Sequence, residues 1–178
     1  MTPKVCVVVG DITEQDVDVV VNAANPYLAN GSGVCGAIFE AVGVDEMEGF
    51  IRKIKRTTGI EAIPEGQSVA TPGGKLKAKW VIHSVGPRYG QSRGKDAELL
   101  ASCYRTALAL ADKKGMKSIA FPSISTGVFG YPAPEAAKVA SEAIRDELGK
   151  LKAVQEVRLV FFRPKDLEVF RKNSVLEV

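Results

Sequence analysis

Short apolar runs alternate with longer amphipathic segments along this chain. The apolar runs have the length of β-strands and occupy residues 4–9, 17–21, 66–71, 79–85, 118–122 and 157–162. The run from Val17 to Val21 is apolar at every position, which is typical of a strand covered on both faces. Between the runs, the pattern predicts helices over residues 34–42, 45–57, 95–114, 134–148 and 164–173.

The alternation of strands and helices predicts the overall architecture. Such a pattern indicates an α/β fold, in which a mostly parallel sheet lies between two helical layers and the crossovers are right-handed. We expect one domain over residues 1–178, because the chain contains neither internal repeats nor a linker. Ligands of such folds bind outside the carboxyl ends of the strands.

Composition excludes several classes of protein. No apolar run reaches 18 residues, and 25% of the residues are charged, so we expect an intracellular, cytoplasmic protein without a membrane span or a signal peptide. Three scattered cysteines and one histidine provide neither a disulfide framework nor a zinc cluster, and we expect no metal and no cofactor. The net charge of +3 is too small to indicate nucleic acid as a partner. Lys113, Lys114 and Lys117 give slight support to an alternative role in RNA binding.

Two glycine-rich loops are the main candidates for a binding site. The first covers residues 22–36 and the second residues 122–132, and each follows a predicted strand and leads into a helix. Unpaired N–H groups and a partial positive charge at a helix N-terminus favour an anion. Two such loops at one crevice therefore suggest a ligand that contains a diphosphate and at least one polar end.

The first loop contains the pattern G-x-G-x-x-G from Gly31 to Gly36, which a dinucleotide-binding domain would also show. That fingerprint begins directly after its strand and has an acidic residue about 20 positions further on. Here the predicted strand ends near Asn22, and Lys55 and Arg56 occupy the later position. The chain also lacks the GxxxxGK[ST] motif of P-loop nucleotide hydrolases.

Asparagines of the first loop have two interpretations. Asn22 and Asn25 could cap the strand end by bonding nearby backbone, or their amides could bind sugar hydroxyls. Asn25 is the better candidate for binding. For His83, in a strand-like run, we expect a partly buried side chain with its hydrogen bonds satisfied rather than a general base.

Three further segments complete the candidate site. Ser125 to Phe129 supply hydroxyls and glycine-flanked amides that suit an anion. Asp11 could accept a hydrogen bond from an adenine amino group or cap the short turn at Ile12. Phe162 could stack on a base or pack in the core.

With these segments in order, the chain resembles a macro domain, an ADP-ribose-binding fold. The motifs are GDIT at 10–13, VVNAAN at 20–25, GSGVCGAI at 31–38, VIHSVGP at 81–87 and FPSISTGVFGYP at 121–132. The last two are most similar to the MacroD branch, whose members remove ADP-ribose from acidic side chains and deacetylate O-acetyl-ADP-ribose. The resemblance implies a three-layer α/β/α sandwich with a mixed, mostly parallel central sheet.

The resemblance also implies roles for individual residues. Asp11 and Ile12 would contact adenine through a carboxylate and a backbone amide, Phe162 would stack on it, and Asn25 would hold and orient the distal ribose. The loop residues would surround the diphosphate and distal ribose: Gly33, Val34, Cys35, Gly36, Ser125, Thr126, Gly127, Val128 and Phe129. The implied partners are ADP-ribose, an ADP-ribosylated protein or O-acetyl-ADP-ribose.

The sequence departs from the MacroD pattern at two positions. Cys35 and Phe39 stand where that branch has an aspartate, credited with assisting the attacking water, and a histidine. Some viral macro domains carry Gly-Val-Cys at this point and remain hydrolases. Two hypotheses follow: a hydrolase of ester-linked ADP-ribose, or a module that binds ADP-ribose without cleaving it. Cys35 itself could be a nucleophile or only a small packing residue.

Overall fold

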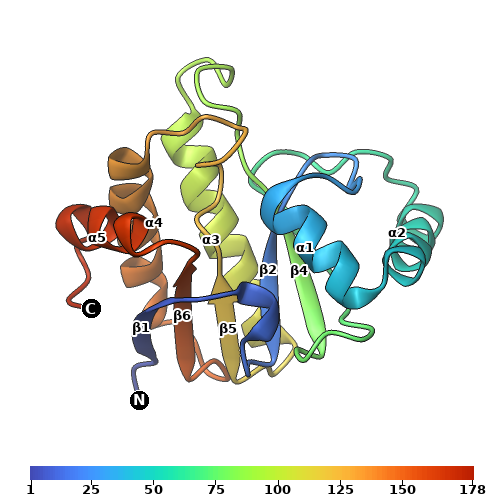
Figure 1. Cartoon of the computed structure of the whole chain (residues 1–178), viewed down its shortest axis with the longest axis horizontal. Helices are drawn as coiled ribbons and strands as arrows, with labels where there is room; N and C mark the ends of the chain where they lie inside the picture. The colour runs from blue at the N-terminus through green and yellow to red at the C-terminus, as the bar shows by residue number, and fades with distance from the viewer.

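The computed structural model describes residues 1–178 and contains one six-stranded sheet (Figure 1). Its order is β1-β6-β5-β2-β4-β3, and all neighbours are parallel except β3 and β4. The strands are β1 (Lys4–Val9), β2 (Val19–Ala24), β3 (Ser68–Pro72), β4 (Trp80–Val85), β5 (Ser118–Phe121) and β6 (Glu156–Phe161). The helices are α1 (Gly33–Val42), α2 (Val44–Thr58), α3 (Asp96–Lys113), α4 (Ala133–Leu148) and α5 (Pro164–Asn173), with a 3₁₀ turn η1 (Ile12–Glu14).

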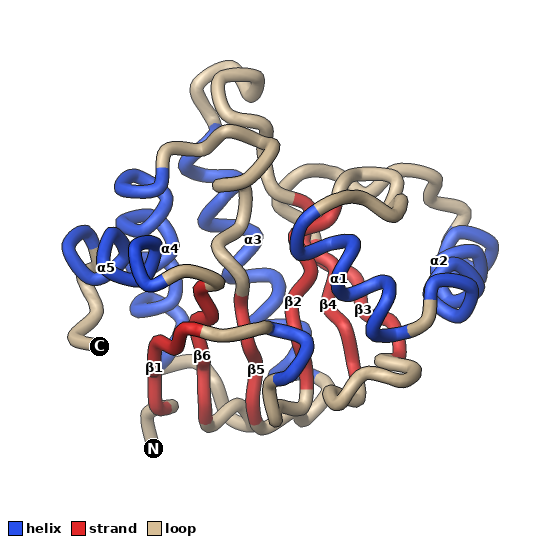
Figure 2. Tube along the Cα trace, in the orientation of Figure 1, coloured by secondary structure: helices blue, strands red, loops and turns tan.

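Helices cover both faces of the sheet (Figures 1 and 2). The side chains between the sheet and the helices form two separate cores. One core lies under α3, α4 and α5, and the other under α1 and α2. Val19 and Val21 enter the first core and Val20 the second, so β2 is buried on both faces as its apolar run predicted. The three-layer α/β/α sandwich with a mixed, mostly parallel sheet is confirmed. None of the helices is long and apolar enough to cross a membrane.

Several strand ends differ from the prediction by one to three residues, and two of these differences affect the candidate site. β2 was expected to end near Val21, but its pairing with β4 continues to Ala24, which places Asn22 inside the sheet opposite His83. β6 ends one residue earlier than expected, because its partner β1 ends at Val9, opposite Phe161. Packing of Phe162 in the core is therefore wrong: its side chain is 81% exposed.

Candidate functional site

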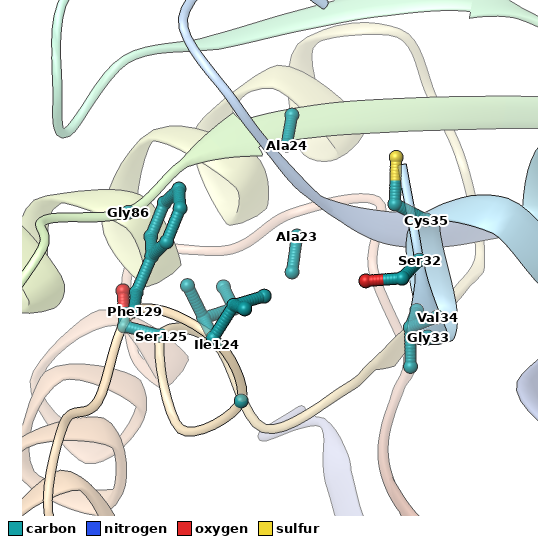
Figure 3. A pocket seen from close by; sticks show the side chains of 12 residues that line it. Ala23, Ala24, Ser32, Gly33, Val34, Cys35, Gly86, Ile124, Ser125 and Phe129 are labelled. Carbon is teal, nitrogen blue, oxygen red and sulfur yellow. The ribbon is translucent and has the colours of Figure 1, made fainter. Parts of the chain in front are cut away.

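A cavity of about 300 Å³ opens at the carboxyl edge of the sheet, between the start of α1 and the loop after β5 (Figure 3). Residues singled out in the sequence supply much of its lining: Gly33, Val34, Cys35, Ser125, Gly127, Val128 and Phe129. The remaining lining residues were not singled out individually in the sequence: Ala23, Ala24, Ser32 and Ile124 lie within the two predicted loops, and Gly86 lies outside them. The extension of β2 explains two of them, since Ala23 and Ala24 are small residues that leave space at the strand end.

The N-terminus of α1 borders the cavity. Ser32 precedes the first helical residue but its side chain makes no capping hydrogen bond. Gly36 is the first residue whose N–H bonds back into the helix, to the Ser32 carbonyl at 3.5 Å. The N–H groups of residues 33–35 have no such acceptor, and the positive end of the helix dipole lies beside them.

Close packing of the first loop on α1 explains one glycine of the G-x-G-x-x-G pattern. A Cβ atom on Gly36 would lie 2.5 Å from the Gly31 carbonyl oxygen, a distance that real side chains do not tolerate. Glycine at this position lets the loop pass directly over the first turn of the helix. The pattern therefore has a packing cause that is independent of any dinucleotide.

The loop after β5 forms the opposite wall and is held by its own side chains. Ser125 has a left-handed backbone with φ of 66°, and its hydroxyl donates to the Pro87 carbonyl at 2.9 Å. The Thr126 hydroxyl donates to the Ser123 carbonyl at 3.0 Å. Both hydroxyl protons are thus used within the protein. The backbone N–H groups of residues 126–129 have no protein acceptor, so they are the donors that this wall offers a ligand.

The segment after β4 fixes that loop from behind. A Cβ atom on Gly86 would collide with Ser125 Oγ, so only glycine permits this approach. The Tyr89 N–H donates to the Phe129 carbonyl at 2.9 Å, and the Arg88 guanidinium lies 4.6 Å from the centre of the Phe129 ring. Phe129 is therefore held by both its backbone and its ring.

Asn25 is half-buried and lies next to the lining residue Ala24, outside the lining itself. Its Nδ2 donates to the Ala29 carbonyl at 2.8 Å, and its Oδ1 accepts from the Ala29 N–H at 3.0 Å. This pair closes the start of the first loop. An asparagine amide has two N–H donors and two oxygen lone pairs, so one of each remains in a fixed plane.

Asp11, Ile12 and Phe162 lie outside the cavity, at the β1 and β6 end of the same sheet edge. Asp11 Oδ1 accepts from the Thr13 N–H at 2.9 Å and from the Thr13 hydroxyl at 2.7 Å, which makes it the cap of η1. Ile12 is buried. The Gly10 N–H donates to the Phe161 carbonyl. Asp11 and the exposed Phe162 are therefore the residues that come directly after the paired ends of β1 and β6.

A buried polar row crosses the sheet behind Cys35. Asn22 Nδ2 lies 3.1 Å from His83 Nδ1 and 3.7 Å from Cys35 Sγ, and His83 Nε2 lies 2.9 Å from Thr71 Oγ1. His83 is wholly buried, and burial lowers its pKa to about 4, so the ring is neutral at pH 7. The satisfied histidine is confirmed, and its burial is complete rather than partial. Strands β2, β4 and β3 supply Asn22, His83 and Thr71; of these, only Thr71 was not discussed from the sequence.

The cavity has no evident general base. No Asp, Glu, His or Lys lines it, and Phe39, one turn after Cys35, is buried in the core under α1. Burial raises the pKa of the Cys35 thiol, and its Sγ–H donates to the Ala29 carbonyl at 3.6 Å. A protonated, buried thiol is a poor nucleophile, which favours the packing interpretation. No group of His, Cys, Asp and Glu side chains could hold a metal ion.

Comparison with known proteins gives consistent matches. A model of the macro domain family matches residues 21–140. A macro domain-containing protein of Listeria monocytogenes is 46% identical over 177 residues, covering 98% of this chain and 99% of its own. An O-acetyl-ADP-ribose deacetylase of Salmonella gallinarum is 43% identical over 162 residues, covering 91% and 89%. A solved structure of an Oceanobacillus iheyensis macrodomain mutant with ADP-ribose has a TM-score of 0.91 at 39% identity, covering 97% and 92%.

Proposed function

Because this chain belongs to the macro domain family, as its motifs predicted, we propose that it binds ADP-ribose in the crevice described above and hydrolyses ester-linked ADP-ribose. The substrates would be proteins mono-ADP-ribosylated on Glu or Asp, and O-acetyl-ADP-ribose. Two relatives support this assignment by their names, the Salmonella deacetylase and the Oceanobacillus macrodomain with ADP-ribose.

One observation carries the binding proposal: two sets of backbone N–H groups without protein acceptors border a single cavity. Those of residues 33–35 come from the start of α1, and those of residues 126–129 from the loop after β5. Neutral N–H donors can surround a diphosphate from two sides without a metal ion or a charged side chain.

Sheet order supports one direction for the ligand. Asp11 and Phe162 follow β1 and β6, whereas the cavity lies over the ends of β5, β2 and β4. With adenine stacked on Phe162 and the diphosphate between the two loops, the distal ribose would point toward β4. Asn25, with one N–H and one lone pair still available, would bond two hydroxyls of that ribose.

The hydrolytic step adds one water molecule across the ester and releases ADP-ribose and a carboxylate. No lining side chain can take the proton of the attacking water. A phosphate oxygen of the bound ligand would accept this proton instead. The backbone N–H groups of the two loops would hold the ester and the water in the orientation needed for attack. Orientation of this kind is worth several kcal/mol of barrier.

A non-catalytic binding module is the second candidate. The observation that favours it is the lining itself, in which Cys35, protonated and 8% exposed, is the only titratable group. A general base usually contributes about 10²- to 10⁴-fold to a rate, and the site lacks that contribution.

Calorimetry with ADP-ribose and product assays on one preparation separate these possibilities. Asn25→Ala should weaken ADP-ribose binding strongly, whereas Asn30→Ala, in the same loop and exposed, is the matched control. An acidic-residue ADP-ribosylated protein and O-acetyl-ADP-ribose are the substrates to be tested. Binding of ADP-ribose without product above background from either substrate would establish the non-catalytic binding module. Absence of ADP-ribose binding would refute both candidate functions.

A further inference from the structure

A loop between β4 and α3 carries cations that the proposed function does not use. Residues 88–95, termed the basic loop, contain Arg88, Arg93 and Lys95, all exposed. None of the three takes part in an ion pair. Figure 1 shows this loop rising beside the loop that precedes α4.

The basic loop has a defined shape. Gln91 N–H donates to the Arg88 carbonyl and Lys95 N–H to the Ser92 carbonyl, which closes two successive turns. Nearby carboxylates are occupied by neutral groups of the loop: Asp96 accepts from the Gly90 N–H at 2.9 Å, Glu65 from the Ser92 hydroxyl at 3.1 Å and Glu135 from the Tyr89 hydroxyl at 3.2 Å. These hydrogen bonds stabilise the loop but leave the three carboxylates charged. Arg93 and Lys95 are exposed and form no ion pair with them, so these two cations remain available to a partner, whereas Arg88 packs on the Phe129 ring.

The basic loop adjoins the β4 end of the crevice. It follows Gly86, which lines the cavity, and Arg88 lies over the Phe129 ring, which lines it too. Adenine is assigned to the opposite end, at β1 and β6. The distal end of a bound ADP-ribose, where a modified side chain would be attached, thus points toward this loop.

We propose that the basic loop docks the acidic polypeptide that carries the ADP-ribose. The inference rests on the proposed function, since the bound nucleotide brings the polypeptide to this place through a covalent bond. Carboxylates flanking a modified Glu or Asp complement Arg93 and Lys95. An RNA, the competing macromolecule, would have to be held by three cations without the nucleotide as an anchor, and phosphate-backbone binding usually uses more contacts than that.

The test uses four probes and two double variants. The probes are ADP-ribose, an acidic peptide bearing ADP-ribose through a hydrolysis-resistant amide, the same peptide with its flanking acids changed to Gln and Asn, and a short single-stranded RNA. Arg93→Asn with Lys95→Gln removes two charges; asparagine tolerates the left-handed φ of 52° at position 93. Arg88 is left unchanged because it packs on Phe129. Lys113→Gln with Lys117→Gln makes the same charge change at the opposite edge of the sheet.

In the Arg93 and Lys95 variant, we expect affinity for the acidic peptide to fall about three- to tenfold, and added salt to reduce the wild-type preference. Affinities for ADP-ribose and the neutral peptide should stay within about twofold, as should all affinities of the control. Equal loss on both peptides, or no loss, overturns the inference. Loss of binding to a short single-stranded RNA, with the peptides unaffected, would assign the loop to RNA instead. Wild-type protein that fails to bind free ADP-ribose refutes the proposed function itself.

Discussion

Acidification should destabilise this fold through one side chain, His83. The ring is wholly buried and packs between Asn22 and Thr71, and burial lowers its pKa to about 4 from an ordinary 6.5. The folded state therefore keeps the ring neutral, whereas the unfolded chain takes up a proton as the pH falls below 6.5. The contribution of the neutral His83 ring to the free energy of unfolding is fully present above pH 6.5 and is lost as the pH falls toward 4.

The size of the effect follows from the two pKa values. One pKa unit corresponds to 1.36 kcal/mol, so a difference of about 2.5 units bounds the loss at about 3 kcal/mol. Relative to pH 7, the linkage gives about 2 kcal/mol at pH 5 and about 3 kcal/mol at pH 4. Carboxylates such as Asp112, whose pKa is lowered, contribute to the pH dependence of the unfolding free energy mainly below about pH 5.

Urea unfolding followed by circular dichroism between pH 7 and pH 4 measures the effect. His83→Gln can still bond Asn22 and Thr71 but does not titrate, so its free energy of unfolding should lose the His83 part of the pH dependence. Ile82→Val, at the adjacent buried position, should cost about 0.5–1.5 kcal/mol at every pH and keep the wild-type slope. Equal slopes for wild type and His83→Gln between pH 7 and pH 5 would refute the reasoning.

Three further predictions concern the crevice. Gly36→Ala forces a Cβ against the Gly31 carbonyl, so we expect loss of about 1–3 kcal/mol of unfolding free energy in urea titrations and about tenfold weaker ADP-ribose binding by calorimetry; unchanged affinity would contradict the packing argument. Phe162→Ala should weaken ADP-ribose binding at least about fivefold, because base stacking is lost, while the melting temperature of this exposed position stays the same. Cys35→Asp places a carboxylate beside Asn22 Nδ2 and should raise the hydrolysis rate at least about tenfold over Cys35→Asn, which has the same shape but no base; equal rates would exclude position 35 as a base.

Much of the fold was predictable because the hydrophobic pattern of each segment agrees with the burial of its side chains in the structure. The continuous apolar run at Val17 to Val21 predicted a strand buried on both faces, and alternate valines do enter opposite cores. The two glycine-rich loops were predicted to meet at one crevice, and residues of both line the cavity. The strand depends on residues that are close in the sequence, and the meeting of the loops follows from the general rule that the carboxyl ends of parallel strands share one edge of the sheet.

Features that depend on partner strands were not predictable. Asn22 and His83 are 61 positions apart, and only the register of β2 with β4 brings them together. Phe162 has the character of a core residue, but the end of its partner β1 leaves it exposed. Likewise, the Ser125 hydroxyl was expected to be free, and the Pro87 carbonyl that accepts its proton comes from a distant loop.

Pairing of β1 with β6 also has a consequence for how the protein matures. β1 is an edge strand whose only partner is β6, near the other end of the chain. During synthesis, β1 stays without its partner until more than 150 further residues have been made. Pairing over such a distance in the sequence is slow. The same pairing brings Asp11 and Phe162 to one place. During synthesis, the residues of the crevice end assigned to adenine are therefore complete only after those of both glycine-rich loops have been made.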